Sequence, residues 1–236
     1  MDFDLAVNEI EAAYRSLKHE LGWRFLCVSK NVLVSNPDIA LITANPGGNR
    51  IPVGHGTASC ENGCAYLTEK WKGGAPAGKA ILQQQVQSLF ETIARKINFN
   101  DGHMALMERS LIAYFIPFRS PRLAQLHRKK ESIAFSRSLW TRLFHKLNPK
   151  LVVTIDTDAF SHMDLLLKQK SGAHSMRHEK CQTGWGNVKA EIKWYATDSN
   201  MISLVRLPHL STFKLFSRAE CRQHIDTIFD FACQHF

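Results

Sequence analysis

Two short segments near opposite ends of the chain carry side chains that could do chemistry on a bound ligand. Asn45 lies in the run 42–50 (ITANPGGNR), and His209 lies in the run 207–211 (LPHLS). The amide of Asn45 cannot take up a proton, but its carbonyl oxygen can orient a water molecule. The imidazole of His209 can donate a hydrogen bond to an anion as its charge develops. If the fold brings them together, the pair suits attack by an oriented water on a bond whose leaving group departs as an anion.

The residues around Asn45 place it at the end of a predicted strand. The apolar residues 39–44 are typical of a buried strand, and Pro46 ends it because proline lacks a backbone donor and has a restricted φ. Gly47 and Gly48 have no Cβ, so a ligand can approach the main chain there. Open α/β sheets bind ligands at the carboxyl ends of their strands. An ordinary Asn-Pro-Gly-Gly turn is the alternative on these residues alone.

Apolar periodicity predicts the elements that must position these residues. Helices are predicted over 4–21, 79–96, 131–147 and 158–168, and from Ser217, where Glu220 completes a capping box. Strands are predicted over 39–44, 111–116, 151–155 and 202–207, with a polar loop over 170–188 and an edge strand over 188–197. Because strands alternate with helices, we expect an α/β three-layer sandwich with a central, mostly parallel sheet. We expect one domain, 1–236, with a Gly-rich insertion at about 51–78.

Composition and charge limit the classes of partner and the location that we expect for the protein. The 236 residues are 44% hydrophobic and carry a formal net charge of +9, which favours a polyanion, nucleic acid first, over a merely soluble basic protein. The acidic first residues predict no signal peptide, and no run approaches the roughly 20 apolar residues of a membrane span, so we expect a cytoplasmic protein. Six scattered cysteines should stay reduced. Cys60 and Cys64 lack a second close pair, so we expect no metal and no cofactor.

In the order of its motifs the chain resembles the uracil-DNA glycosylase superfamily. Residues 44–47 (ANPG) are similar to the Asn-Pro-Gly loop of the first family motif, and residues 209–213 (HLSTF) match the His-x-Ser segment of the second. Residues 118–121 (FRSP) resemble the turn after the middle strand, and residues 148–150 (NPK) precede the next strand as in these enzymes. Each motif alone is weak, but the ordered set covers nearly the whole chain.

The resemblance implies a monofunctional DNA glycosylase that flips a base out of double-stranded DNA and acts as a monomer. Asn45 would orient the water, His209 would bind the departing base, and Phe213 would enter the base stack as a wedge. A buried core histidine and a packed core phenylalanine remain the alternatives for the last two. The residues expected to line the base pocket are Ala44, Pro46, Gly47, Tyr114 and Tyr66, and those expected to contact DNA are Ser211, Phe213, Lys214, Arg218, Arg119 and Arg50.

Two departures from the family pattern bear on the target base. Uracil-specific relatives carry an aromatic residue where this chain has Gly47, and relatives that read uracil often carry an asparagine where the best match here is Tyr114. A site that is open beside C5 of a pyrimidine suggests a base modified at that position. Some phage-defence members of the superfamily excise glucosylated hydroxymethylcytosine, and this chain is a candidate for that activity. A uracil or mismatched-base glycosylase is the alternative.

Two further alternatives need no glycosylase chemistry. A non-catalytic DNA-binding module on the same fold would keep the basic surface without requiring Asn45. A phosphoryl-transfer enzyme or nuclease would use the Gly-rich stretch, but the chain has no phosphate-binding G-x-x-x-x-G-K-[ST] run, and carboxylates do not cluster at strand ends apart from Asp156 and Asp158. The insertion itself, with Tyr66, Lys70, Trp71 and Lys72, suits either a lid facing nucleic acid or a surface loop.

Overall fold

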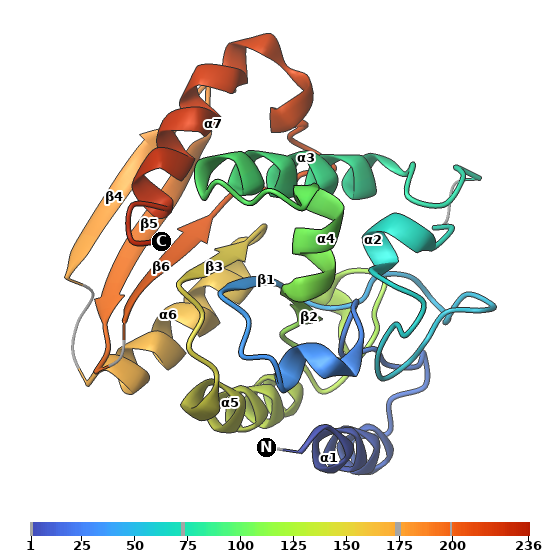
Figure 1. Ribbon diagram of the computed structural model, residues 1–236. Helices are drawn as coiled ribbons and strands as arrows, with labels where there is room; N and C mark the ends of the chain where they lie inside the picture. The colour runs from blue at the N-terminus through green and yellow to red at the C-terminus, as the bar shows by residue number, and fades with distance from the viewer. Residues whose placement is uncertain (1, 72–73, 173–175, 199) are drawn as a thin grey trace.

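The structure, a computed structural model, describes residues 2–71, 74–172, 176–198 and 200–236. Within these residues one sheet has the strand order β2-β1-β3-β6-β5-β4 (Figure 1). The strands are β1 (Ile39–Thr43), β2 (Leu111–Tyr114), β3 (Leu151–Thr154), β4 (Arg177–Gln182), β5 (Lys189–Ala196) and β6 (Met201–Arg206). The first three strands and β6 are parallel, whereas β5 and β4 continue the sheet in antiparallel fashion. The predicted α/β fold with a mostly parallel sheet is confirmed.

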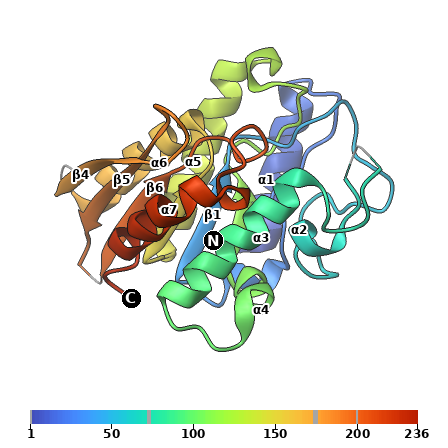
Figure 2. The same cartoon turned by 90° about the horizontal axis from the view of Figure 1, so that it is seen from above.

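Helices cover both faces of this sheet. They are α1 (Phe3–Ser16), α2 (Ala65–Thr68), α3 (Ile81–Lys96), α4 (Gly102–Arg109), α5 (Lys129–Lys146), α6 (Thr157–Ser171) and α7 (Ala219–Ala232), with short 3-10 turns η1 (Lys30–Leu33), η2 (Leu123–Gln125) and η3 (Leu215–Ser217). Seen from above, α3, α4 and α7 lie on one side of the sheet, and α1, α5 and α6 lie on the other (Figure 2). The three layers of the predicted sandwich are therefore present.

The central strands β1 and β3 form where the chain is apolar at every position except a final threonine. In β1 and β3 all residues are buried. A parallel strand between two helical layers has both faces covered, so it needs a continuous apolar run rather than an alternating one. The registers are continuous across the sheet, because Ile42 of β1 pairs with Thr154 of β3, which pairs with Arg206 of β6. The carboxyl ends of these three strands therefore meet at one edge.

Two predictions at the antiparallel side of the sheet are wrong. The polar loop predicted over 170–188 contains strand β4, and the edge strand predicted over 188–197 is not an edge, since β4 pairs with β5 along its length. The side chains of β4 are exposed or only half buried, as befits an edge strand, so its sequence carries no apolar signal. Residues 173–175 of the predicted loop lie outside the described part of the chain.

Two helix boundaries and one additional helix also differ from prediction. Helix α1 ends at Ser16 rather than near residue 21, because Lys18 turns into the left-handed region with φ 56°. Helix α4 was not predicted. Helix α7 begins at Ala219 without a side-chain cap, so the predicted capping box is wrong: the Ser217 hydroxyl instead accepts a hydrogen bond from the Gln85 amide of α3 at 2.5 Å.

The insertion at 51–78 packs onto the body of the molecule beside β2. Its backbone carbonyls at Thr57 and Ala58 accept hydrogen bonds from the amides of Phe25 and Leu26, at 3.1 and 3.0 Å. The buried amide of Gln83 in α3 donates to two further carbonyls of the insertion. The described part of this segment is thus joined to the core by main-chain and side-chain bonds. In the described part of the chain, every helix is too short or too polar to cross a membrane.

Candidate functional site

The amide of Asn45 is held in one orientation just beyond the end of β1. Its Nδ2 donates hydrogen bonds to the Ser120 hydroxyl at 2.9 Å, the Pro46 carbonyl at 3.2 Å and the Phe118 carbonyl at 3.3 Å. Three acceptors around this position show that it holds the amide nitrogen, since the carbonyl oxygen would face the lone pairs of the acceptors. Among the described residues none donates to Oδ1. The side chain is half buried, so this oxygen can accept a hydrogen bond from a water or a ligand.

The turn after β2 supports this arrangement from the neighbouring strand. The amide of Ser120 donates to the Pro46 carbonyl at 3.2 Å, and the guanidinium of Arg119 donates to the Gly47 carbonyl. Arg119 is only 8% exposed, and burial lowers its pKa. Its Nε has no partner among the described residues. The sequence predicted a DNA contact for Arg119, but the structure places it beneath the Asn45 loop, where it holds the main chain of that loop.

The sheet brings Asn45 and His209 to the same edge at the same level. Asn45 lies three residues beyond Ile42, and His209 lies three residues beyond Arg206, the position aligned with Ile42 through β3. Strand β3 separates them, so two inter-strand spacings, about 10 Å in all, lie between the two chain paths. Asn45 and His209 therefore follow the two strands that flank β3, one on each side of it.

Asp156 lies just beyond β3, the strand between those that precede Asn45 and His209. Its Oδ2 accepts from the backbone amide of Ala44 at 3.0 Å, and its Oδ1 accepts from the amide of Ala159 at 2.6 Å as the N-cap of α6. Burial raises the pKa of Asp156 to about 6, although the two backbone hydrogen bonds act in the opposite direction. Asp156 therefore joins the residue preceding Asn45 to the next strand, a role that the sequence did not reveal.

This raised pKa predicts a pH-dependent contribution to stability. Below the ordinary pKa of 3.8 the Asp156 carboxyl is protonated in both the folded and the unfolded protein. Between pH 3.8 and about 6 only the folded protein keeps this proton, so the free energy of unfolding falls as the pH rises. The difference between the two pKa values corresponds to a loss of roughly 3 kcal/mol. For Asp156→Asn, the free energy of unfolding measured with urea is expected not to fall between about pH 4 and about pH 7. The variant is less stable at every pH to the extent that one backbone amide loses its acceptor. Asp158→Asn, an exposed neighbour, is the control, and equal slopes for wild type and Asp156→Asn would contradict the assignment.

His209 opens a tight turn after β6. Its carbonyl accepts from the amides of Thr212 and Phe213 at 3.0 and 2.9 Å, and its Nδ1 lies 2.9 Å from the Ser211 hydroxyl. The side chain is exposed, yet partial loss of hydration lowers the pKa of the imidazole, which keeps it neutral near pH 7. When the Ser211 hydroxyl donates to Nδ1, the ring proton lies on Nε2. That N–H is then available to a ligand. The buried core histidine considered from the sequence is not what the structure has.

The residues predicted to line a base pocket fall into two groups. Ala44 is half buried, Pro46 is buried and Gly47 is exposed, all next to Asn45. A Cβ added to Gly47 would meet nothing within 4 Å, so the space beside it is open. Tyr114 is half buried at the end of β2, whereas Tyr66 is only 1% exposed and lies in the core. The structure thus brings four of the five to the edge of the sheet and buries Tyr66 in helix α2 of the insertion.

A buried ion pair that joins the insertion to the body of the molecule was missed by sequence reasoning. Arg24 and Glu69, 4% and 7% exposed, form two parallel hydrogen bonds of 2.8 and 2.7 Å. The carboxylate also accepts from the Trp71 indole at 3.2 Å and lies 3.1 Å from the His55 ring. Trp71, which the sequence placed in either a lid facing nucleic acid or a surface loop, therefore donates to this cluster, while Lys70 of the same stretch is exposed. Lys72 of that stretch lies outside the described residues.

Two residues after β6 that were predicted to contact DNA lie against the ring of Trp185. Phe213 is half buried, and its ring meets the Trp185 ring edge to face at 5.8 Å. The guanidinium of Arg218 lies 4.0 Å from the centre of the same Trp185 ring. Lys214 is exposed, as is Arg50 at the other side of the site. Trp185 lies in a stretch that the sequence predicted to be a polar loop, and no signal in the sequence connects it with Phe213.

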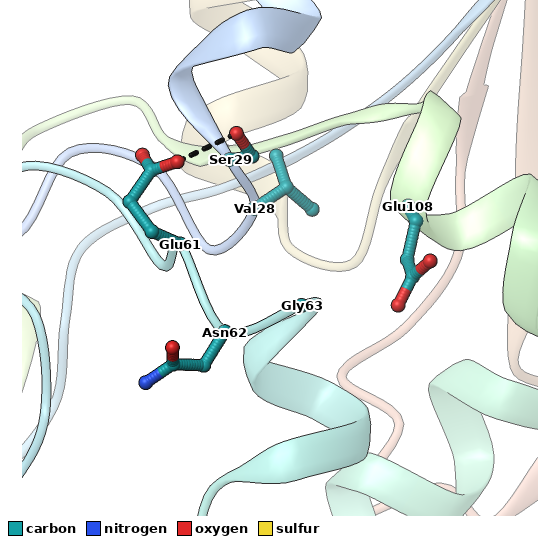
Figure 3. Close-up of a pocket in the computed structure, with 6 residues that line it drawn as sticks. All are labelled: Val28, Ser29, Glu61, Asn62, Gly63 and Glu108. Carbon is teal, nitrogen blue, oxygen red and sulfur yellow. Dashed lines mark hydrogen bonds between the residues drawn. The ribbon is translucent and has the colours of Figure 1, made fainter.

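A cavity of about 370 Å³ lies near the start of β2, and neither Asn45 nor His209 lines it. Figure 3 shows the residues that line this cavity. Its lining residues are Val28, Ser29, Glu61, Asn62, Gly63 and Glu108. The Glu61 carboxylate there already accepts a hydrogen bond from the Ser29 hydroxyl at 2.7 Å. The described residues contain no group of three or more His, Cys, Asp or Glu side chains placed to hold a metal ion, and all six cysteines are free.

Comparison with known proteins adds no relative. No protein-family model matches the chain. No curated protein matches it significantly. A functional interpretation therefore depends on the geometry at the carboxyl edge of the sheet, together with the motif resemblance.

Proposed function

We propose that this protein is a DNA glycosylase that removes a modified pyrimidine from double-stranded DNA and leaves an abasic site. One observation supports this most directly: the Asn45 amide is anchored through its nitrogen, and its Oδ1 accepts from no donor among the residues that the structure describes. The strand register puts Asn45 level with His209 across one intervening strand. In the proposed reaction the bond between the sugar C1′ and the base nitrogen breaks. A water held by Oδ1 supplies the oxygen that bonds to C1′, and its proton passes to solvent.

His209 has the complementary task in this proposal. The electron pair of the broken bond leaves with the base, so negative charge develops on the ring. A neutral imidazole with its proton on Nε2 donates a hydrogen bond to that charge without surrendering the proton. The lowered pKa of His209 favours this neutral form, and its exposed position leaves the ring accessible. No metal or organic cofactor enters the proposed reaction.

The open space at Gly47 favours a pyrimidine carrying a bulky group over uracil. An aromatic ring there would close the site beside C5, whereas a Cβ at Gly47 would touch nothing within 4 Å. Glucosylated hydroxymethylcytosine, as found in phage DNA, is the candidate base, and antiviral defence in the cytoplasm is the corresponding role. The net charge of +9 suits a DNA partner, and we propose that the protein acts as a monomer. Uracil or a mismatched base is the second candidate target.

A panel of duplex DNAs tests the proposal. The substrates carry uracil, a mismatched thymine, hydroxymethylcytosine or its glucosylated form, and mass spectrometry detects the free base while abasic sites are counted. We expect release from the glucosylated substrate in buffer containing a metal chelator. His209→Ala should slow it by ~10²–10³, the usual cost of one such donor. The exposed His145→Ala on α5 is the control.

Each other outcome of the panel has a definite meaning. Release from uracil DNA alone would reject the modified-base proposal and leave the repair alternative. A requirement for Mg²⁺ would indicate phosphoryl-transfer chemistry instead. DNA binding without any base release would favour the non-catalytic module.

A further inference from the structure

The turn that links β4 to β5 is a closed, rigid support for one aromatic ring. The Val188 carbonyl accepts from both the amide and the hydroxyl of Thr183, at 3.2 and 2.7 Å, and the amide of Val188 donates to the Trp185 carbonyl at 3.0 Å. The Thr183 hydroxyl also accepts from the amide of Trp185 at 3.3 Å. These bonds fix the main chain on both sides of Trp185.

Close packing against α7 holds the whole turn in place. Gly184 has φ 78°, and a Cβ there would come within 2.5 Å of the Glu220 carbonyl oxygen and 2.9 Å of the Cys221 Cα. Only glycine satisfies both the left-handed backbone and this close approach. The turn therefore cannot shift toward the helix, and the position of the Trp185 ring is determined by the sheet and by α7 together.

The Trp185 ring joins two side chains that the proposed function assigns to DNA. Phe213 meets it edge to face at 5.8 Å, with an interplanar angle of 84°. The guanidinium of Arg218 lies over it at 4.0 Å. Edge-to-face aromatic pairs and cations over an indole face are both attractive arrangements. Trp185 thus lies between the expected wedge and an expected phosphate contact, and positions both.

Phe213 is in turn rigidly related to His209. The His209 carbonyl accepts from the Phe213 amide at 2.9 Å, and the amide of Leu215 donates to the Phe213 carbonyl at 2.8 Å. Those bonds set the main chain of Phe213 but not the direction of its ring. The half-buried ring packs partly against the core, and Trp185 contacts it edge to face.

We propose that Trp185 is a positioning residue that braces Phe213 when the Phe213 ring enters the base stack of duplex DNA. This inference rests on the proposed glycosylase function. A wedge must resist the stacked bases that close behind the extruded nucleotide, and an unsupported ring would turn aside. Single-stranded DNA has no stack to hold open, so the brace matters only for a duplex.

The test compares base release from matched duplex and single-stranded substrates under single-turnover conditions. Trp185→Ala is expected to slow release from the duplex about 3- to 10-fold, the effect of losing one aromatic pair, and to leave the single-stranded rate unchanged. Trp185→Phe keeps an aromatic ring and should recover most of the duplex rate. Met176→Ala, an exposed substitution at the far end of the same hairpin, is the control.

A second readout separates bracing from folding. The fluorescence of 2-aminopurine placed beside the target base reports unstacking, and its rise should be smaller for Trp185→Ala than for the wild type. Equal losses on duplex and single strand would overturn the inference, because they indicate damage to the fold or to the chemistry. An unchanged duplex rate would overturn it as well. A wild-type protein that releases no base from either substrate would instead refute the proposed function, and the brace with it.

Discussion

Replacing Asn45 with alanine is expected to reduce base release by about 10²-fold or more while DNA binding persists. The amide nitrogen donates to Ser120, Pro46 and Phe118, so the carbonyl oxygen has one fixed direction for a water. Alanine removes that oxygen, and the water is no longer placed for attack. Single-turnover release from the modified duplex, compared with binding of the same duplex by fluorescence anisotropy, measures the two effects separately.

Two matched variants sharpen this test. Asn45→Asp keeps the shape but replaces the donor with a carboxylate oxygen facing the carbonyls of Pro46 and Phe118, so the side chain must turn away and activity should fall as it does in Asn45→Ala. Ser120→Ala removes one of three acceptors and should cost far less, since the two carbonyls still orient the amide. Full activity of Asn45→Ala would contradict the proposed mechanism, and it would direct attention to Asp156 as the group that handles the water.

Breaking the buried ion pair between Arg24 and Glu69 of the insertion is expected to cause the largest loss of stability. Arg24 is only 4% exposed, and Glu69→Ala leaves its guanidinium without a carboxylate partner. The same change removes the acceptor used by Trp71 and the partner of His55. Removing one member of such a pair typically costs about 3–5 kcal/mol. Urea unfolding measures the free energy, and limited proteolysis reports whether the insertion at 51–78 is released first.

The matched control removes both charges at once. Arg24→Met with Glu69→Leu replaces the pair by apolar side chains of similar length, and it should cost much less than Glu69→Ala because no unpaired charge remains. Trp71 and His55 lose a partner in both proteins, so the comparison isolates the stranded guanidinium. A loss below about 1 kcal/mol for Glu69→Ala would show that water reaches Arg24 and that the insertion is not closed over the pair.

The sequence by itself determined the central sheet. Strands β1, β2, β3 and β6 were predicted because strands buried on both faces are mainly apolar, and each lies in a short run of mainly apolar residues. It also placed Asn45 and His209 correctly at strand ends, because Pro46 and Pro208 end the strands locally. These are short-range consequences of side-chain burial and proline geometry, so no knowledge of distant contacts was needed.

The tertiary structure alone decided which residues meet at the site. Strand β4 is polar and became a strand only by pairing with β5, a contact that its own side chains do not signal. The order β1-β3-β6 put Asp156 between Asn45 and His209, and the packing of the β4–β5 turn against α7 brought Trp185 to Phe213. Such contacts depend on how layers pack, because hydrogen bonds and ring contacts between distant segments leave no periodic pattern in the sequence.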